Sequence, residues 1–448
     1  MKDIQQQSLY LVSLGCPKNL VDSEVIAGNL LSNGAAWAYS PEEATVYVIN
    51  TCAFLPEARE EAASEIAQAV LWKAEAPEER TIVVCGCLSQ YDRNGEFAGR
   101  FPEVDIWAGI DDIAVLDKII AGKRKVSRSK EYLYNSETAL LALTLEHTAY
   151  IKIADGCNNL CSYCAIPSLR GSLRSRRLAD IVREAEVCIA NGAKELILVA
   201  QDITVYGVDR PEDKEDLPKL LKALDALDGD FGIRLLYTHP AHYTDELFET
   251  LRDLKHLIPY VDIPLQHIND RILKAMNRHV DSARIKEVIS RLREAVPQIT
   301  IRTTFITGLP GETEEEFAEL EEFIRKSKFD RVGVFPYSPE PGTPAAGMAD
   351  QVPHEIAEER ASKIMTYCRS AMKRANKKLA GSVMDVIVDS VGDGYAVARG
   401  SSDAPDIDNA VFVVNIPRRT QPGDRLTVEI TGTDKCDLVA TVKKGKRR

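Results

Sequence analysis

Three closely spaced cysteines constrain the fold of this chain more than any other feature of its sequence. Cys157, Cys161 and Cys164, here called the CxxxCxxC cysteines, directly follow a predicted strand at 149–154. Three thiolates at this spacing can hold three irons of a 4Fe–4S cluster and leave the fourth iron open to another ligand. Zinc is the alternative, but zinc usually takes a fourth protein ligand and none lies nearby in the sequence. The pattern therefore predicts an iron–sulfur site at the end of a strand.

A long alternation of strands and helices surrounds this motif. Candidate strands lie at 149–154, 195–200, 233–238, 260–264, 299–306 and 331–335, and candidate helices include 178–191, 243–254, 281–295 and 312–327. Six βα units are typical of a partial TIM-type barrel, whose active site lies at the carboxyl ends of the strands. The CxxxCxxC cysteines follow the first strand, at that end.

A shorter alternation of strands and helices over the first 122 residues predicts a small parallel sheet. Each of its three apolar strands is followed within three residues by a cysteine, and these are Cys16, Cys52 and Cys87, here called the N-terminal trio. Loops at the carboxyl ends of parallel strands meet at one edge, so the trio can converge on a metal site. The ordinary role of a free cysteine is a small buried hydrophobe. We expect this role for Cys85, which lies inside the third strand.

Changes of pattern along the chain divide it into domains with an α/β fold overall. The segment 126–146 is polar without a clear period and is predicted to be a linker. A charged helix at about 353–379 is followed by five short apolar runs separated by turns, which indicate a small OB-like β-barrel. The expected domains are the N-terminal cluster domain at 1–125, the barrel domain at 147–376 and the C-terminal β-barrel at 377–448.

Composition and charge argue against a membrane protein and a DNA-binding protein. No apolar run approaches the roughly 20 residues of a membrane span. We therefore expect a cytoplasmic protein whose ten cysteines are reduced. The net charge of −12 argues against broad binding to nucleic acid, although the runs 170–177 and 443–448 are basic. The segment 381–442 holds ten acidic and five basic residues, so the C-terminal barrel should attract a basic partner.

Several motifs resemble those of the radical S-adenosylmethionine methylthiotransferase family. They are Leu14-Gly15-Cys16-Pro17-Lys18-Asn19 with Asp22-Ser23-Glu24, Gly156-Cys157-Asn158-Asn159, and Ala165-Ile166-Pro167-Ser168-Leu169-Arg170-Gly171. Within the family they resemble the RimO branch, because the tRNA-modifying relatives typically carry Gln-Met-Asn at 17–19. The resemblance covers nearly the whole chain and implies a cluster domain, a radical domain and a C-terminal TRAM domain.

The resemblance also implies the cofactors and the reaction. Attack on an unactivated carbon–hydrogen bond needs a radical that only a cofactor supplies. By resemblance, a 4Fe–4S cluster on the CxxxCxxC cysteines cleaves S-adenosylmethionine to make this radical. A second 4Fe–4S cluster on the N-terminal trio delivers sulfur methylated by a second S-adenosylmethionine, so each turnover uses two. The implied substrate is the β-carbon of an aspartate in small-subunit ribosomal protein S-12, and the implied partners are a flavodoxin- or ferredoxin-type electron donor and a sulfur source.

Further site residues are expected around the rim of the barrel. By resemblance, the candidate contacts to S-adenosylmethionine are Tyr163, Gln201, Asp202, Gln266 and Gly308. For Gln201 and Asp202 the alternative is an ordinary solvated loop. Gly308 closes a strand and opens a helix, where bare backbone amides can meet a ligand, or where the chain simply turns.

Two arginines are candidate substrate contacts. Alternation along 299–306 places Arg302 on the face opposite Ile301, so it is expected to point into the barrel, where it would bind a carboxylate or form a structural ion pair. Arg170 follows the CxxxCxxC cysteines closely enough to border the site and attract an acidic group. Its alternative is a solvated helix start.

Two other functions compete with this hypothesis. One is a MiaB-like tRNA adenosine methylthiotransferase on the same architecture, and the other is a non-catalytic iron–sulfur protein that senses redox state or binds RNA. The acidic surplus of the C-terminal barrel favours a protein substrate over tRNA.

Overall fold

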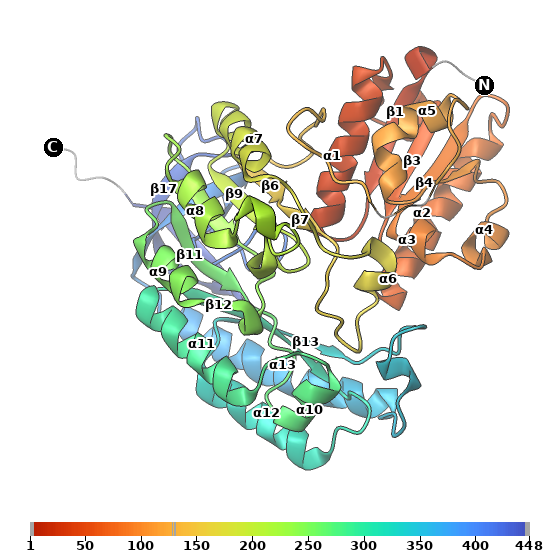
Figure 1. Ribbon diagram of the computed structural model, residues 1–448. Coiled ribbons are helices and arrows are strands. Elements are labelled where there is room, and N and C mark those ends of the chain that lie inside the picture. The colour runs from red at the N-terminus through yellow and green to blue at the C-terminus, as the bar shows by residue number, and fades with distance from the viewer. Residues whose placement is uncertain (1–3, 128, 130, 444–448) are drawn as a thin grey trace.

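The computed structural model describes residues 4–127, 129 and 131–443. Figure 1 shows an N-terminal unit with helices on both faces of a sheet, a central βα unit, and a β-barrel that lies behind the central unit. Within the described residues, no helix has the length and apolar character required to cross a bilayer.

A five-stranded parallel sheet forms the N-terminal unit. Its strands, in the order β2-β1-β3-β4-β5, are β1 (Ser8–Ser13), β2 (Ala36–Trp37), β3 (Val46–Thr51), β4 (Thr81–Gly86) and β5 (Ile106–Trp107). Helix α1 (Pro17–Ser32) packs against one face of the sheet and α2 (Pro56–Ala74) against the other, because alternate residues of β3 and β4 belong to two different cores. The three predicted strands are confirmed. The two edge strands were not predicted, since two residues are too short to show a period.

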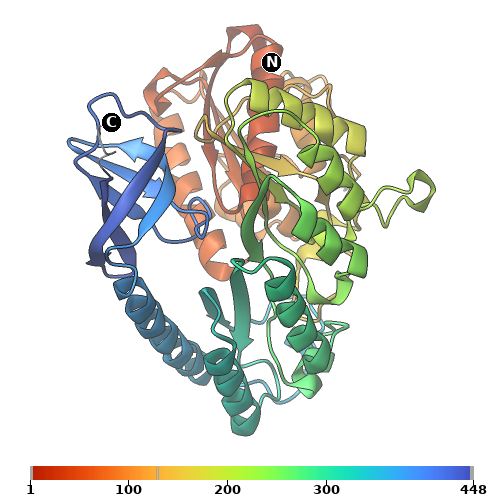
Figure 2. The ribbon, with the colours of Figure 1, turned by 90° about the vertical axis from the view of Figure 1, so that its left-hand side faces the viewer.

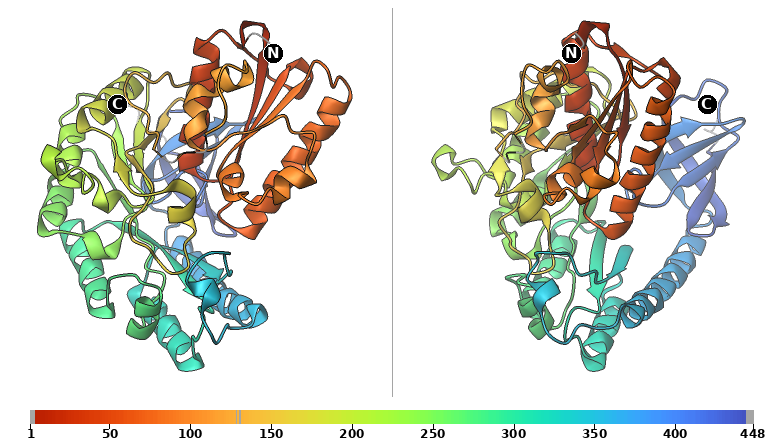
Figure 3. Two further views of the ribbon diagram at one scale, coloured as in Figure 1. Left: turned by 45° about the vertical axis from the view of Figure 1, so that its right-hand side comes forward. Right: turned by 90° about the vertical axis from the view of Figure 1, so that its right-hand side faces the viewer.

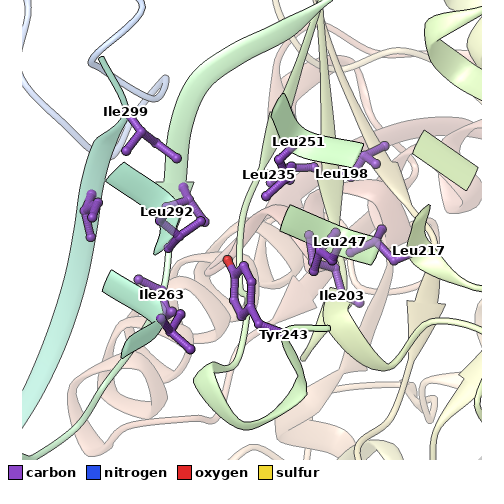
Figure 4. Close-up of a cluster of buried hydrophobic side chains, with 14 of the residues drawn as sticks. Leu198, Ile203, Leu217, Leu235, Tyr243, Leu247, Leu251, Ile263, Leu292 and Ile299 are labelled. Atoms are coloured by element: carbon purple, nitrogen blue, oxygen red, sulfur yellow. The ribbon is translucent and has the colours of Figure 1, made fainter. Parts of the chain in front are cut away.

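The central unit is an open, six-stranded parallel sheet that follows the sequence order. Its strands are β6 (Thr148–Lys152), β9 (Glu195–Val199), β10 (Gly232–Leu235), β11 (Leu257–Asp262), β12 (Thr300–Thr307) and β13 (Arg331–Pro336). The helices between them are α7 (Leu178–Ala190), α8 (Leu217–Asp225), α9 (Asp245–Asp253), α11 (Ser282–Ala295) and α12 (Glu314–Ser327). Their apolar faces form one core with the sheet, part of which Figure 4 shows around Leu235, Leu247 and Leu292. The expected partial barrel is confirmed.

The C-terminal unit is a closed five-stranded barrel. Helix α13 (His354–Lys377) leads from the central unit to it, as Figures 2 and 3 show. The strands, in the order β14-β15-β16-β18-β17, are β14 (Val383–Val391), β15 (Tyr395–Arg399), β16 (Val411–Val414), β17 (Arg425–Asp434) and β18 (Asp437–Val442). All five expected strands are present. The basic run at 443–448, apart from Lys443, lies outside the described residues.

Ion pairs hold the C-terminal barrel on the central sheet. Arg331 of β13 contacts Asp403 at 2.6 Å, and Arg399 of β15 contacts Glu195 of β9 at 2.9 Å. The hydroxyl of Tyr260 donates to Asp408 at 2.6 Å. Asp403 and Asp408 were expected to add to an acidic surface for a basic partner, but they are instead used inside this interface.

The segment 126–146 contains no helix or strand among its described residues, yet it packs closely against α1. Tyr134 is buried with 2% of its surface exposed. The backbone of Ala139 lies so close to Gly28 that a Cβ at Gly28 would be 2.2 Å from the Ala139 carbonyl oxygen. The carboxylate of Glu24 accepts a hydrogen bond from the backbone N–H of Leu143 at 2.9 Å. This segment therefore buries polar groups of α1.

Glu24 should make the stability of the protein depend on pH. Burial raises the pKa of Glu24 from its usual 4.5 to about 7, so the folded state binds the proton more tightly than the unfolded state. The proton bound to Glu24 makes its full contribution to the free energy of unfolding below pH 4.5. This contribution is lost as the pH rises through 7. Glu24→Gln, which keeps the acceptor for Leu143, should therefore be more stable than the parent at pH 8 by roughly 2 kcal/mol. The two should be equally stable at pH 4.5.

Urea unfolding of both proteins across this pH range measures the effect. The matched control is Glu57→Gln on α2, because Glu57 is exposed and should give no pH-dependent difference. If the difference in unfolding free energy between Glu24→Gln and the parent does not grow with pH, the raised pKa of Glu24 is wrong.

Candidate active site

The N-terminal trio lies at the carboxyl edge of the first sheet. Cys16 caps α1 after β1, Cys52 follows β3, and Cys87 begins α3 (Cys87–Tyr91) after β4. The backbone at Gly15, which has a φ of +91°, lies very close to Cys52. A Cβ on Gly15 would be 3.0 Å from the Cys52 sulfur. The pKa of the Cys87 thiol is raised to about 11, chiefly by burial; Arg170 opposes this rise, and the thiols of Cys52 and Cys16 add to it. The three thiols therefore face one another.

Cys85 lies two residues before Cys87 but belongs to the core. Its side chain is fully buried, and its sulfur donates to the Ile49 carbonyl at 3.6 Å. Burial strongly raises the pKa of this thiol. The structure thus places Cys85 where the alternation of β4 predicted it.

The CxxxCxxC cysteines lie in a loop after β7 (Ala154–Asp155), at the carboxyl edge of the central sheet. The backbone N–H of Asn159 donates to the Cys157 sulfur at 3.5 Å. The Arg278 guanidinium donates to the Cys161 sulfur at 3.6 Å. The pKa of Cys157 is raised to about 11 and that of Cys164 to about 12, chiefly by burial and in smaller part by the neighbouring thiols. Here too three thiols share one small region.

Neither set of thiols forms the compact group that a single zinc ion would need, among the residues that the structure describes. In neither set do all three sulfur atoms lie within 4.8 Å of one another. Thiolates around one tetrahedral zinc would be about 4 Å apart, because each Zn–S bond is about 2.3 Å. All ten cysteines are free thiols. Three separated thiols without a fourth protein ligand fit an iron–sulfur cube better than zinc.

A buried charge cluster joins the two cysteine sites. Arg170, from α6 (Ile166–Arg170), donates to Asp22 of α1 at 2.8 Å and to Asp155 at 3.0 Å. Lys152 of β6 contacts the same two carboxylates. Arg170 also donates to the Cys87 sulfur at 3.4 Å. These four charged residues, here called the bridging cluster, link the N-terminal unit to the central unit.

The run 170–177 is therefore not the basic patch or solvated helix start that the sequence suggested. Arg170 has only 2% of its surface exposed, and Arg176 is buried against Glu184 at 2.6 Å and over the ring of Tyr134. Both guanidinium groups are neutralised inside the protein. Arg177 is the exposed member of the run. Arg170 contacts Cys87 of the N-terminal trio, whereas it was expected to border the site of the CxxxCxxC cysteines, and a contact with an acidic group of the substrate stays a prediction.

Two predicted rim residues have a free acceptor. The side-chain amide of Gln201 donates through Nε2 to Asp155 at 2.8 Å. Gln266 has a φ of +70° and forms an isolated β-bridge with Phe305 of β12. The side-chain carbonyl oxygens of Gln201 and Gln266 are both buried and have no hydrogen-bond partner among the described residues. A buried acceptor without a donor is costly, so these oxygens suit a ligand with N–H or O–H groups.

Tyr163 and Gly308 are less open to a ligand. The Arg278 guanidinium donates to the Tyr163 hydroxyl at 3.5 Å, and the Tyr163 ring packs against a small apolar cluster. The expectation of a bare amide at Gly308 is wrong, because this N–H donates to the Glu312 carboxylate at 2.8 Å. The carboxylate of Glu312, four residues later, accepts the hydrogen bond that a ligand would otherwise take from the Gly308 N–H.

Asp202, His239 and His242 converge within 4.8 Å, but their hydrogen bonds do not suit a metal ion. Nδ1 of His239 accepts from the Ala241 N–H, so neutral His239 carries its proton on Nε2. Asn159 donates to Asp202 through Nδ2 at 2.8 Å and therefore presents its carbonyl to Nε2 of His242. Both imidazoles then offer N–H donors rather than lone pairs. Asp202 is thus part of a hydrogen-bonded rim and not of a solvated loop.

Arg302 forms an ion pair. It contacts Asp262 of β11 at 2.9 Å and Asp408 of the C-terminal barrel at 3.5 Å. These partners match the structural alternative given above for Arg302, while a contact with substrate stays a prediction.

Two cations of the site were not predicted from the sequence. Arg278 follows α10 (Asp270–Ala275) and reaches Cys161. Lys18 of α1 is 8% exposed and places Nζ 3.3 Å from the centre of the Tyr237 ring. Burial lowers the pKa of Lys18, and the charges of Cys16 and Asp262 oppose this. The proximity of Lys18 to Cys16 in the sequence was the available signal.

Comparison with known proteins agrees with this arrangement. The Uncharacterized protein family UPF0004 matches residues 8–109, the Radical SAM superfamily 151–324 and the TRAM domain 380–442. The ribosomal protein uS12 methylthiotransferase RimO of Akkermansia muciniphila is 43% identical, covering 96% of this chain and 98% of that protein. The RimO of Syntrophus aciditrophicus is 41% identical, covering 98% and 99%.

The chain belongs to the RimO family. It is therefore a radical S-adenosylmethionine methylthiotransferase, and it uses S-adenosylmethionine and a 4Fe–4S cluster as members of that superfamily do. The family resemblance drawn from the sequence motifs is confirmed. The fold also matches a solved radical methyltransferase, TsrM from Kitasatospora setae, with a TM-score of 0.55 at 14% identity over 75% of this chain and 76% of that one.

The bridging cluster should be a major source of stability in this RimO-family enzyme. Asp22→Asn removes one charge from a buried set and leaves Lys152 and Arg170 to share Asp155. Breaking a buried ion pair in this way costs about 3 to 5 kcal/mol. Urea unfolding should show this loss, and hydrogen exchange of β6 should accelerate.

The matched control is Asp245→Asn. Asp245 is also paired with an arginine, at 2.7 Å, but its side chain is 83% exposed. Its loss should change the unfolding free energy by less than about 1 kcal/mol. Equal effects of the two substitutions would contradict the buried role of Asp22.

Proposed function

We propose that this enzyme adds a methylthio group to the β-carbon of an aspartate in ribosomal protein S12. The observation that carries the proposal is the pair of three-thiol sites joined by one buried charge cluster, in a chain whose near-full-length relatives are named for this activity. Two three-thiol sites agree with a reaction that needs both hydrogen abstraction and sulfur insertion.

In this proposal the CxxxCxxC cysteines hold the cluster that binds S-adenosylmethionine, and the N-terminal trio holds a second 4Fe–4S cluster. When bound, these groups supply the radical and the methylated sulfur, with two S-adenosylmethionine molecules used per turnover. The residues of the protein bind and orient the clusters and the cofactor. Arg278 beside Cys161 and Arg170 beside Cys87 offset thiolate charge at their sites. The free carbonyl oxygens of Gln201 and Gln266 can accept hydrogen bonds from the cofactor's amino group.

The remaining contacts and partners are proposed on chemical grounds. Tyr163 and Asp202 complete the rim near the CxxxCxxC cysteines, and Arg170 lies beside Cys87 of the N-terminal trio. Reduction of a cluster requires an external one-electron donor of flavodoxin or ferredoxin type, and each product consumes a sulfur atom from an outside source. The boundaries 1–125, 147–376 and 377–448 are proposed for the three domains, with 126–146 between them.

The tRNA-modifying alternative receives less support. The relatives are named for a ribosomal protein, and the C-terminal barrel carries an acidic surplus that disfavours phosphate. A non-catalytic iron–sulfur protein is excluded by membership of an enzyme family.

The two cysteine sets should separate into two activities. Anaerobically reconstituted enzyme should hold about eight irons, and replacing all three CxxxCxxC cysteines by alanine should leave about four and abolish formation of deoxyadenosine. Alanine at the N-terminal trio should also leave about four irons but should retain deoxyadenosine formation and lose methylthiolation. Iron analysis and chromatography measure these outcomes.

Cys85→Ser is the matched control for the trio. It should destabilise the core without loss of iron, because the side chain is buried in the sheet. Loss of a whole cluster in this variant would show that Cys85, and not Cys87, is the ligand.

The choice of substrate can be tested with both candidate molecules. Purified enzyme with both clusters should add a methylthio group to an aspartate of ribosomal protein S12 and none to tRNA. Mass spectrometry of the protein and of digested tRNA distinguishes the two. Methylthio-adenosine in tRNA, together with unmodified S12, would reject the proposed function.

A further inference from the structure

Lys18 is a buried cation that forms no hydrogen bond or ion pair with the residues that the structure describes. Its side chain lies in the first turn of α1 with 8% of its surface exposed. Nζ lies over the Tyr237 ring at 3.3 Å from its centre. Across the described residues, no hydrogen bond or ion pair to this ammonium group is recorded. A cation–π contact alone compensates only part of the cost of removing an ammonium group from water.

Two other buried cations of this region already have acidic partners. Arg170 is shared between Asp22 and Asp155, and Arg302 is shared between Asp262 and Asp408. Asp155 and Asp262 each accept a hydrogen bond from one of these arginines and make none with Lys18. Lys18 differs from both arginines because its charge is available to an incoming anion.

The position of Lys18 connects the two cysteine sites. It lies two residues after Cys16 of the N-terminal trio. Tyr237, beneath its ammonium group, follows β10 at the carboxyl edge of the central sheet and adopts φ +63°. The backbone N–H of Tyr237 donates to Asp262 at 3.2 Å, which fixes the ring at the rim. An anion bound to Lys18 would therefore lie between the N-terminal trio and the mouth of the radical domain.

We propose that Lys18 binds the side-chain carboxylate of the substrate aspartate, and this rests on the proposed function. The β-carbon of aspartate is bonded directly to its carboxylate carbon. An ammonium group that holds the carboxylate therefore fixes the position of the carbon that reacts. A buried, charge-assisted hydrogen bond also discriminates between substrates, because a neutral side chain at that position would leave Lys18 unpaired. Lys18 is thus the residue that determines specificity for aspartate over asparagine.

Equilibrium binding tests this role without turnover. The probes are ribosomal protein S12 and its variant in which the modified aspartate, identified by mass spectrometry, is asparagine. Both are titrated anaerobically, without reductant, against enzyme that carries its clusters. The parent enzyme should prefer the aspartate form. Lys18→Met should weaken binding of the aspartate form by roughly 10- to 100-fold and that of the asparagine form by less than about twofold.

Two further variants separate charge from packing. Lys18→Arg keeps the charge and should retain the preference for aspartate, whereas Lys18→Gln should lose it as Lys18→Met does. Lys118→Met on α5 (Leu116–Ile120) is the matched control, because Lys118 is exposed in the same unit and should change neither affinity. Iron content is measured for each variant so that affinities are compared only between proteins with equal clusters.

The outcomes distinguish this proposal from the proposed function. Suppose that the parent enzyme modifies S12, but that Lys18→Met and Lys18→Gln weaken binding of the aspartate and asparagine forms of S12 equally, or weaken binding of neither form. Then the role proposed for Lys18 is wrong and the proposed function stands. If the parent enzyme neither binds nor modifies S12, both are wrong.

Discussion

The arrangement of this enzyme depends on one buried set of charges, the two carboxylates and two cations of Asp22, Lys152, Asp155 and Arg170. Each member is almost fully removed from water, so each is tolerated only while its partners are in place. Asp155 lies two residues before Cys157, and Arg170 contacts the sulfur of Cys87. The same contacts that dock the first sheet on the second therefore also fix the distance between the two thiol sites.

Much of the fold follows from local patterns in the sequence. Apolar runs of four or more residues mark the strands of all three units, and every strand predicted in this way is present. Such patterns do not predict very short strands or the packing of segments that are far apart in the sequence. The two-residue strands Ala36–Trp37 and Ile106–Trp107 have no period, and the close contact of 126–146 with α1 depends on Gly28 and Tyr134, which are far apart in the chain.

For the site, spacing identified the thiols, but the surroundings of each charge required the structure. A run of arginines in a sequence is normally exposed, yet Arg170 and Arg176 are buried because acidic partners from distant segments reach them. Arg302 was placed correctly on its strand face, but its partners come from a neighbouring strand and from Asp408, which lies 106 residues later in the chain. For Lys18 the sequence shows only that it lies near Cys16, because its burial and its lack of an ion pair with the described residues depend on the tertiary structure.

The contacts of Arg302 and Arg331 limit how this chain could be shortened or recombined. Asp403 and Asp408 of the C-terminal barrel neutralise arginines on two strands of the catalytic sheet, and Glu195 of that sheet neutralises Arg399 of the barrel. A chain that ended after α13 would expose uncompensated charge on the catalytic sheet beside Asp262. A C-terminal barrel borrowed from another protein would need the same acidic pattern on its docking face. In this protein the barrel is part of the catalytic body, and gain or loss of an RNA- or protein-binding appendage at this place would require coordinated change on both sides of the contact.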